Sequence, residues 1–313
     1  MKRKLAGKQG NRPLISGRDS NGYFLPESLA EAVNLLGQAG EGLKVLAGGT
    51  DLLVDLYERL IEVEGWLDLG LIPELREIKV RAEQIEIGAM VTHAQLEKSE
   101  NIKKTLPVLA AAAAEIGSPQ IRNRGTIGGN VVTASPAGDL LAPLIAYNAV
   151  LELVGKDGVS RVPAGDFFCG PKQTIMKRGQ LLSRVLIPRP SSGTIGCWIK
   201  IGKRKALVIA SISLALVVRL AKGGVIADIR ACFGAVAPTP LEIKAVRRLA
   251  GGKRLEQLDF SQVGELAAAG IAPIDDLRGT AAYRRNVARE LLIQALEKVQ
   301  STGGEIIADQ ADC

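Results

Sequence analysis

Two short stretches of the sequence combine glycines with threonine and a closing polar residue. They are residues 47–51, AGGTD, and residues 125–130, GTIGGN. Glycine allows positive φ and a close approach to the main chain, so successive N–H groups can surround an anion. The side chains of Thr50, Thr126 and Asn130 add donors without a full charge. Two such stretches favour an extended, doubly charged ligand such as a pyrophosphate, although each could also be only a tight turn.

Other nucleotide-binding and metal-binding patterns are missing from the sequence. Neither glycine stretch reads GxGxxG, and no GxxxxGK followed by serine or threonine occurs, so a standard dinucleotide fold or a P-loop is not supported. The cysteines Cys169, Cys197, Cys232 and Cys313 form no CxxC pair, and His93 is the only histidine. We therefore expect free, reduced thiols, and neither a zinc site nor an iron–sulfur cluster within this chain.

The positive charge of the chain is concentrated near its start. A formal charge of +7 suggests an acidic partner such as nucleic acid, but six basic residues precede the first acid, Asp19. The rest of the chain holds 34 basic and 33 acidic residues, so nucleic-acid binding is not expected. We predict a flexible basic leader over residues 1–21. Its six basic residues before Asp19 are Lys2, Arg3, Lys4, Lys8, Arg12 and Arg18.

No segment of the sequence predicts export or insertion into a membrane. The first twenty residues lack the continuous apolar core of a secretion signal. The apolar stretch 206–218, ALVIASISLALVV, is too short to span a bilayer and contains two serines, so it predicts a buried strand. We therefore expect a cytoplasmic protein without a membrane span.

The hydrophobic pattern predicts helices and strands in alternation, which is typical of a mixed α/β or α+β protein. The composition of residues 188–194, PRPSSGT, resembles a linker and predicts a domain boundary. The expected elements are a helix capped by Ser28, a strand over 43–46, a helix capped by Thr92 with His93 in its first turn, an alanine-rich helix over 105–116, a helix after Asp139 followed by a hairpin turning at 156–158, and a terminal helix over 280–299.

Five segments together resemble a known family of flavoproteins. In chain order they read KVLAGGTDLL, QIRNRGTIGGNVVTASPAGDLLAPLIA, DFFCGPKQT, WIKIGKRKA and YRRNVARELL. With these segments, the chain from about residue 23 to residue 299 resembles the FAD-binding subunit of the xanthine dehydrogenase and aerobic carbon monoxide dehydrogenase family of molybdenum hydroxylases. The second segment is highly specific.

The resemblance implies an α+β fold with two domains. The first is a FAD-binding domain of the vanillyl-alcohol oxidase (PCMH) type with two α+β subdomains, and the second is a smaller C-terminal α+β domain. The expected divisions are a leader over 1–21, the FAD-binding domain over 22–194 with its subdomains split near 75–80, the C-terminal flavoprotein domain over 195–302, and a flexible tail over 303–313.

The resemblance also places noncovalent FAD between the two subdomains. Residues 44–51 would hold its pyrophosphate from one side and residues 126–130 from the other, and four further residues match flavin-contacting positions. The expected cofactor-binding residues are Lys44, Val45, Leu46, Ala47, Gly48, Gly49, Thr50, Asp51, Ile116, Thr126, Ile127, Gly128, Gly129, Asn130, Asp139, Leu182 and Lys200, with no catalytic side chain and no metal ligand.

Three of the polar residues leave alternatives open. Asp139 is suited to accept hydrogen bonds from ribityl or ribose hydroxyls, and it could also cap the helix that follows. Lys200 could neutralise a phosphate or negative charge on a reduced flavin, or be a solvated surface lysine. His93 could attach FAD covalently, as a histidine does in some relatives of this fold, but a structural or surface histidine is the expectation.

The implied function is electron transfer within a larger complex, with the redox chemistry carried by the cofactor. Substrate would be oxidised at a molybdenum–pterin cofactor of a large subunit, and electrons would pass through the 2Fe–2S clusters of a small subunit onto FAD and then to an acceptor such as NAD⁺ or a quinone. The implied assembly is a heterotrimer or its dimer. Alternatives are a stand-alone FAD-dependent oxidase of the same fold and a non-enzymatic protein; the single histidine and an aromatic content of 4% favour the subunit.

Overall fold

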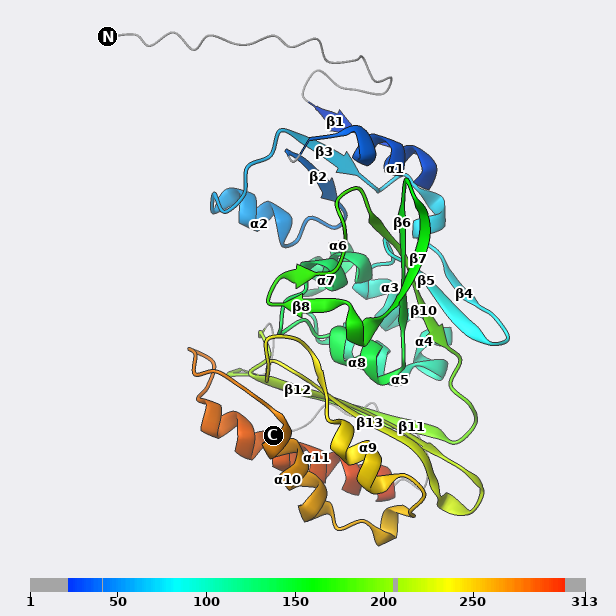
Figure 1. Cartoon of the computed structure of the whole chain (residues 1–313), viewed down its shortest axis with the longest axis vertical. Helices are drawn as coiled ribbons and strands as arrows, with labels where there is room; N and C mark the ends of the chain where they lie inside the picture. Colours follow the sequence, from blue (N-terminus) through cyan, green and yellow to red (C-terminus); the bar gives the residue numbers. More distant parts are fainter. Residues whose placement is uncertain (1–21, 41, 205–207, 302–313) are drawn as a thin grey trace.

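The computed structural model describes residues 22–40, 42–204 and 208–301, so the predicted leader and tail lie outside the described residues. Three units follow one another along the long axis of the molecule (Figure 1). A small sheet with its helices lies at one end, a mixed unit lies in the middle, and a four-stranded sheet with helices lies at the other end. The expected α+β architecture is confirmed.

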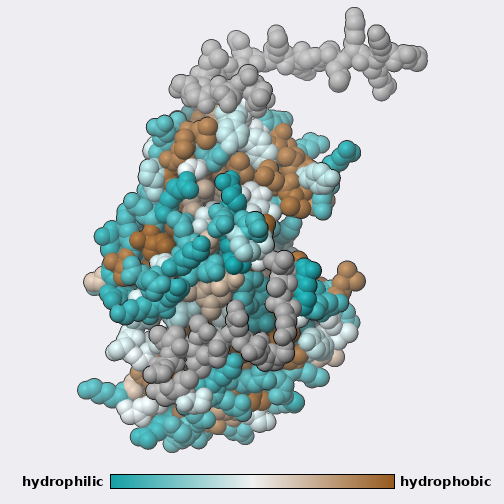
Figure 2. All heavy atoms as spheres, turned by 180° about the vertical axis from the view of Figure 1, so that it is seen from behind, coloured by the Kyte–Doolittle hydropathy of each residue, from teal (hydrophilic) through white to brown (hydrophobic). Residues whose placement is uncertain are grey.

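The N-terminal unit is a parallel sheet in the order β1-β3-β2. Helix α1 buries Ala32, Val33 and Leu35, and it begins as predicted at Ser28, whose hydroxyl accepts the N–H of Glu31. No residue of α2 is buried. Figure 2 shows that the upper part of the back face exposes apolar residues. The elements are β1 (Tyr23–Phe24), α1 (Leu29–Gln38), β2 (Leu43–Leu46), α2 (Leu52–Tyr57), β3 (Gly65–Asp68) and the 3-10 turn η1 (Pro73–Leu75).

The middle unit is an antiparallel sheet in the order β4-β5-β10-β6-β7, with helices packed against it. The expected helix over 105–116 is shortened by Pro107, which begins α5, while the preceding helix ends at Thr105. The strands are β4 (Ile78–Val80), β5 (Gln84–Gly88), β6 (Val150–Gly155), β7 (Gly158–Pro163) and β10 (Leu181–Pro188). The helices are α3 (His93–Lys98), α4 (Glu100–Thr105), α5 (Pro107–Ala114), α6 (Pro119–Arg124), α7 (Ile127–Thr133) and α8 (Leu141–Ala146). A 3-10 turn, η2 (Ala164–Asp166), and a small hairpin of β8 (Phe168–Gly170) and β9 (Gln173–Thr174) complete the unit.

The C-terminal sheet is antiparallel in the order β11-β12-β13-β14 and is buried on both faces. Trp198, Ala215 and Cys232 are paired neighbours across three strands, and they pack into the core of the middle unit. The alternate residues of these strands pack against α9, α10 and α11. The elements are β11 (Thr194–Ile201), β12 (Ile212–Leu220), η3 (Lys222–Gly224), β13 (Ile226–Gly234), β14 (Leu241–Glu242), α9 (Lys244–Ala250), η4 (Leu255–Gln257), α10 (Phe260–Gly270) and α11 (Ala281–Ser301).

Burial on both faces explains the apolar stretch that the sequence predicted to be a strand. Because side chains alternate across a strand, only a strand covered on both sides is apolar at every position. The strand observed there, β12, begins only at Ile212 and is buried to Val218. Residues 208–211 of the predicted stretch are not in a strand, and residues 206–207 lie outside the described residues. Among the described residues, no helix is both long enough and apolar enough to cross a membrane.

Candidate functional site

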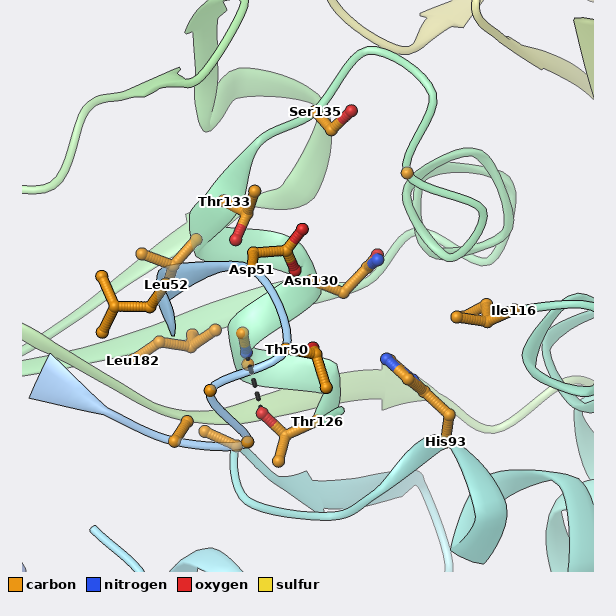
Figure 3. A pocket seen from close by; sticks show the side chains of 18 of the residues that line it. Thr50, Asp51, Leu52, His93, Ile116, Thr126, Asn130, Thr133, Ser135 and Leu182 are labelled. Atoms are coloured by element: carbon orange, nitrogen blue, oxygen red, sulfur yellow. Dashed lines mark hydrogen bonds between the residues drawn. The ribbon is translucent and has the colours of Figure 1, made fainter. Parts of the chain in front are cut away.

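A cavity of about 670 Å³ lies where the N-terminal and middle units meet. The loop between β2 and α2 forms one wall, and α7 with the segment that follows it forms another. The start of α3, the residues after α5 and the start of β10 complete the lining, and the C-terminal domain adds Val208 and Ile209. Figure 3 shows side chains from these separate segments pointing toward a common space.

The first glycine stretch offers free main-chain donors to this cavity. Among the described residues, the N–H groups of Gly48, Gly49 and Thr50 have no hydrogen-bond acceptor, and Gly49 has a φ of 74°. A Cβ added to Gly48 would collide with the carbonyl oxygen of Arg124, so this loop lies directly on the main chain before the second stretch. The two glycine stretches, far apart in the sequence, are therefore neighbours in the fold.

The second stretch is the beginning of a helix, and most of its main-chain donors are already used. Ile127 N–H donates to Val91 O (2.9 Å) and Gly128 N–H donates to Ala89 O (2.9 Å). Gly129 N–H donates to Thr126 Oγ1 (3.0 Å), which makes Thr126 the N-cap of α7. The expectation of a series of free N–H groups at this stretch is therefore wrong, because two of these donors join α7 to the segment before α3 and the third caps α7. Among the described residues, the N–H of Thr126 has no acceptor.

The two glycines at positions 128 and 129 have different reasons to be glycine. A Cβ at Gly128 would lie 2.6 Å from Ala89 O and 2.7 Å from Ala89 Cβ, so this glycine permits close packing inside the protein. A Cβ at Gly129 would meet only Thr126 Oγ1, at 3.1 Å, within 4 Å. Because Gly129 lines the cavity, it is the position where missing side-chain atoms leave room for a ligand.

Three polar atoms of the cavity walls are buried without a hydrogen-bond partner among the described residues. They are His93 Nδ1, Asn130 Oδ1 and Asp139 Oδ1, and all three residues line the same cavity. A buried polar group without a partner costs about 1–3 kcal/mol, so native proteins seldom retain one without a reason. Three of them around one cavity indicate a site for a polar ligand.

Asp139 is held by a lysine from the C-terminal domain. Lys200 Nζ lies 2.6 Å from Asp139 Oδ2 and donates to the carbonyl oxygen of Glu115 at 3.0 Å. The side chain of Lys200 is only 3% exposed, so the alternative of a solvated surface lysine is wrong. The alternative of a helix cap at Asp139 is also wrong, since Leu140 is the N-cap residue of α8 and no side chain caps it.

The electrostatics of Asp139 reflect its enclosure. Burial raises the pKa of Asp139 to about 6, the charge of Lys200 opposes this rise, and the Glu115 carboxylate adds to it. One carboxylate oxygen is bound to Lys200 while the other, Oδ1, has no partner. Asp139 can therefore accept a hydrogen bond from a hydroxyl in the cavity while Lys200 balances its charge.

His93 belongs to the cavity, although the sequence did not predict it there. Thr92 caps α3 as expected, with a reciprocal capping box to Gln95, and His93 follows as the first helical residue. The side chain is 4% exposed and lines the cavity, so the surface alternative is wrong. Burial, and then the charge of Arg122, lower the pKa of His93 to about 4, which keeps the imidazole neutral near neutral pH.

Most of the predicted site residues face the cavity, and four do not. On β2, Val45 lines it while Lys44 and Leu46 do not, because alternate side chains of a strand point to opposite faces. Ile127 is fully buried in the core, and Lys200 reaches the site only through Asp139. The predicted residues that line the cavity are Val45, Ala47, Gly48, Gly49, Thr50, Asp51, Ile116, Thr126, Gly128, Gly129, Asn130, Asp139 and Leu182.

The sequence missed several other lining residues. Thr133 and Ser135 follow the second glycine stretch, so proximity in the sequence was a usable signal. Gln180, Val208 and Ile209 lie in segments with no motif, and only the tertiary structure brings them to the cavity.

Two family models cover nearly all of the described chain. The FAD binding domain in molybdopterin dehydrogenase matches residues 18–190, and the CO dehydrogenase flavoprotein C-terminal domain matches residues 198–299. The carbon monoxide dehydrogenase medium chain of Hydrogenophaga pseudoflava is 38% identical over 279 residues, which is 88% of this chain and 95% of the relative. The xanthine dehydrogenase FAD-binding subunit of Escherichia coli O157:H7 is 30% identical over 92% of this chain and 99% of the relative.

Solved structures agree with the sequence relatives. Carbon monoxide dehydrogenase from Hydrogenophaga pseudoflava, in a form that lacks the Mo-pyranopterin moiety, matches with a TM-score of 0.85 at 35% identity over 90% of this chain and 97% of that chain. Quinoline 2-oxidoreductase from Pseudomonas putida 86 matches with a TM-score of 0.84 at 26% identity over 92% of this chain and 99% of that chain. The fold and the site define a flavoprotein. The chain belongs to the family of FAD-binding medium subunits of carbon monoxide dehydrogenase and xanthine dehydrogenase.

The residues of the cavity fit the FAD of this family. Free N–H groups at Gly48, Gly49 and Thr50 suit phosphate oxygens, and the open backbone at Gly129 permits close approach. Asn130 and Asp139 present unpartnered oxygens that can accept hydrogen bonds from sugar or ribityl hydroxyls. The donor set is therefore that of a polar, phosphate-containing organic cofactor.

Proposed function

We propose that this chain is the electron-transferring FAD subunit of a molybdenum hydroxylase, assembled with a small iron–sulfur subunit and a large molybdopterin subunit. The observation that carries the proposal is the cavity between the two glycine stretches, with three unpartnered polar atoms in its walls. The relatives support it, because their names describe a medium chain and a FAD-binding subunit. We further propose a heterotrimer, or its dimer, and NAD⁺ or a quinone as the final acceptor.

We assign different roles in cofactor binding to the two glycine stretches. Gly48, Gly49 and Thr50 donate main-chain N–H groups to the pyrophosphate, since these donors have no other acceptor among the described residues. Gly129 admits the cofactor close to the start of α7, and Asn130 offers its amide beside it. The second stretch thus contributes space and a side chain, while the first contributes the donors.

Asp139 and Lys200 act as a unit in this proposal. Lys200 holds Oδ2 of Asp139, which fixes the carboxylate and leaves Oδ1 to accept a hydrogen bond from a cofactor hydroxyl. Lys200 is therefore a positioning residue supplied by the C-terminal domain. When bound, FAD supplies the one-electron and two-electron redox chemistry, and the protein supplies position, charge balance and exclusion of water.

The absorption spectrum of the purified full-length chain tests the cofactor assignment. We expect one noncovalent FAD per chain, which acid precipitation releases into the supernatant, and no oxidation of organic substrate by the chain alone. A Gly129→Val variant should fold and lose FAD, because the branched side chain enters the cavity. Gly37→Ala is a matched control, since a Cβ at Gly37 meets nothing within 4 Å and lies outside the cavity. A colourless wild-type protein that cannot be reconstituted with FAD would overturn the proposal.

Co-expression with the neighbouring reading frames tests the assembly. We expect a small, cysteine-rich chain and a very large chain to co-purify with this one, and substrate to reduce the flavin only when both are present. Flavin reduction by an organic substrate in the isolated chain would instead favour the stand-alone oxidase. The oligomeric mass of the purified complex separates the heterotrimer from its dimer.

A further inference from the structure

The main chain around His93 is fixed from two sides. His93 N–H donates to Gly125 O (3.0 Å), which ties the start of α3 to the second glycine stretch. On either side of His93 in the sequence, Thr92 and Gln95 bind each other: Gln95 N–H donates to Thr92 Oγ1 (3.2 Å), and Thr92 N–H donates to Gln95 Oε1 (2.8 Å). The direction of the His93 side chain is therefore set by the cap of α3 and by the partner segment.

The imidazole ring lies against a glycine and projects into the cavity. A Cβ at Gly125 would lie 2.9 Å from His93 Cδ2 and 3.0 Å from Nε2, so a side chain at position 125 would crowd the ring. Figure 3 shows the ring extending from α3 toward the space between Thr50, Asn130 and Ile116. The bare backbone at Gly125 thus makes room for a polar side chain of the protein itself.

The two nitrogens of the His93 ring differ in their access to the cavity. A neutral imidazole carries one N–H and one lone pair. Nδ1 is buried and has no partner among the described residues, whereas Nε2 is not fully enclosed, so Nε2 is the nitrogen that a ligand in the cavity can reach. The Arg122 guanidinium, which binds Glu97 with Nε to Oε2 at 2.8 Å, places a positive charge nearby and disfavours a second proton on the ring. A donor role for His93 therefore requires the neutral tautomer with its proton on Nε2.

We propose that His93 is a cofactor-binding residue, a neutral histidine that donates its Nε2–H to an oxygen of the bound FAD. This inference rests on the proposed FAD site. A neutral donor adds a hydrogen bond to the cavity without a charge that would alter the balance between Asp139 and Lys200. It also assigns His93 a noncovalent role, in contrast to histidines that carry a covalently attached flavin.

The single histidine makes a direct test possible. In an untagged full-length chain labelled with ¹⁵N-histidine, every imidazole nitrogen signal comes from His93, because the sequence has no other histidine. We expect the cofactor-free chain to show the neutral Nε2–H tautomer. Added FAD should shift the Nε2–H resonance and slow its exchange with solvent. Unchanged imidazole signals at full FAD saturation, or a proton on Nδ1, would overturn the role of His93 while leaving the FAD site intact.

Variants give an independent measure of the same hydrogen bond. His93→Leu removes the donor at similar size and should raise the FAD dissociation constant about tenfold, which corresponds to one buried hydrogen bond. His93→Gln retains a side-chain N–H and should recover part of the affinity. Tyr147→Phe is the control, since it removes a buried hydroxyl that accepts the N–H of Val108 at 3.3 Å, outside the cavity.

The affinity measurements separate the possible failures. Equal FAD affinity in wild type and His93→Leu refutes the hydrogen bond at His93. An equal loss in His93→Leu and Tyr147→Phe refutes it as well, because the loss would then follow general destabilisation. Absence of FAD binding in the wild-type chain overturns both this inference and the proposed function. If His93→Leu fails to fold, the NMR experiment on the wild-type chain still decides the question.

Discussion

Replacement of Lys200 by methionine tests how the two domains share the site. The variant removes the ammonium group from Asp139 Oδ2 (2.6 Å) and from Glu115 O (3.0 Å) while retaining much of the apolar stem. Removing one partner of a buried ion pair typically costs about 3–5 kcal/mol, because the remaining charge has no partner. We expect this loss of stability to depend on pH, because a protonated Asp139 carries no charge that needs a partner.

The sign of this dependence follows from the pKa of Asp139, which is raised from 3.8 to about 6. Between these values the folded state binds more protons than the unfolded state, so this group makes the protein less stable as the pH rises through the window, by about 3 kcal/mol in total. Without Lys200, the pKa of Asp139 in the folded state rises further, so the pH range over which stability falls extends to higher pH. Lys200→Met should therefore cost about 1 kcal/mol near pH 5, where Asp139 is mostly protonated, and about 3 kcal/mol near pH 8.

Urea unfolding of the cofactor-free chain across this pH range measures the effect. Lys203→Met is the matched control, because Lys203 is exposed in the same region of the chain. The double variant Lys200→Met with Asp139→Asn should regain much of the stability at high pH, since it leaves no unpaired charge. A loss for Lys200→Met that is independent of pH, or no larger than that of the control, would refute the ion-pair argument.

Three further predictions concern the stability of the chain. Arg284 is 1% exposed and donates to Ser211 O (2.9 Å), Ile274 O (2.7 Å) and Asp276 Oδ1 (2.6 Å). Arg284→Met should therefore lower the free energy of unfolding by about 3–5 kcal/mol, as measured by chemical denaturation. A loss below about 1 kcal/mol would contradict this prediction. Hydrogen bonds and charge from Arg278, and then the hydrogen bond from Arg284, lower the pKa of Asp276 to about 2. The matching stabilisation is present above pH 3.8 and is lost as the pH falls toward 2, and acid titration should show a slightly smaller loss in the variant. Gly37→Ala should stabilise α1 by about 0.5–1 kcal/mol, and an unchanged or lower melting temperature would count against it. Gly128→Val should lower the free energy of unfolding by about 1–3 kcal/mol, because the added side chain overpacks the contact with Ala89. If the variant instead keeps a normal melting temperature and loses FAD, the added side chain occupies the cavity and the packing argument is wrong.

Local structure was largely predictable because its causes lie close together in the sequence. Ser28 and Thr92 cap helices as expected, since a cap involves only residues three positions apart. The strand over Leu43–Leu46 and the hairpin of β6 and β7 were also predicted, and both are observed. The expectation for residues 105–116 was too long, because Pro107 separates two helices at a point where the alanine-rich composition continues.

The roles of individual site residues were less predictable because they depend on contacts between distant segments. The GTIGGN stretch suggested a nest of free N–H groups, but the N–H groups of Ile127, Gly128 and Gly129 bind Val91, Ala89 and Thr126. Lys200 was expected to contact the cofactor or the solvent, and its side chain is buried against Asp139. The pairing of Lys200 with Asp139 could not be identified from one sequence, since it depends on how the C-terminal sheet packs against the middle unit.

The sequence by itself determined the chemistry that this protein can offer: two glycine stretches, few aromatic groups, one histidine and the motifs of a flavoprotein family. Residue type and spacing suffice for that, because they fix local backbone freedom and the donors available. The tertiary structure decided which of those groups meet. It leaves the donors of the first stretch free and uses most of those of the second. It also buries Lys200 against Asp139 and turns His93 into the cavity. Burial and competition for hydrogen bonds are properties of the folded chain, and they decide which polar groups remain available to a ligand.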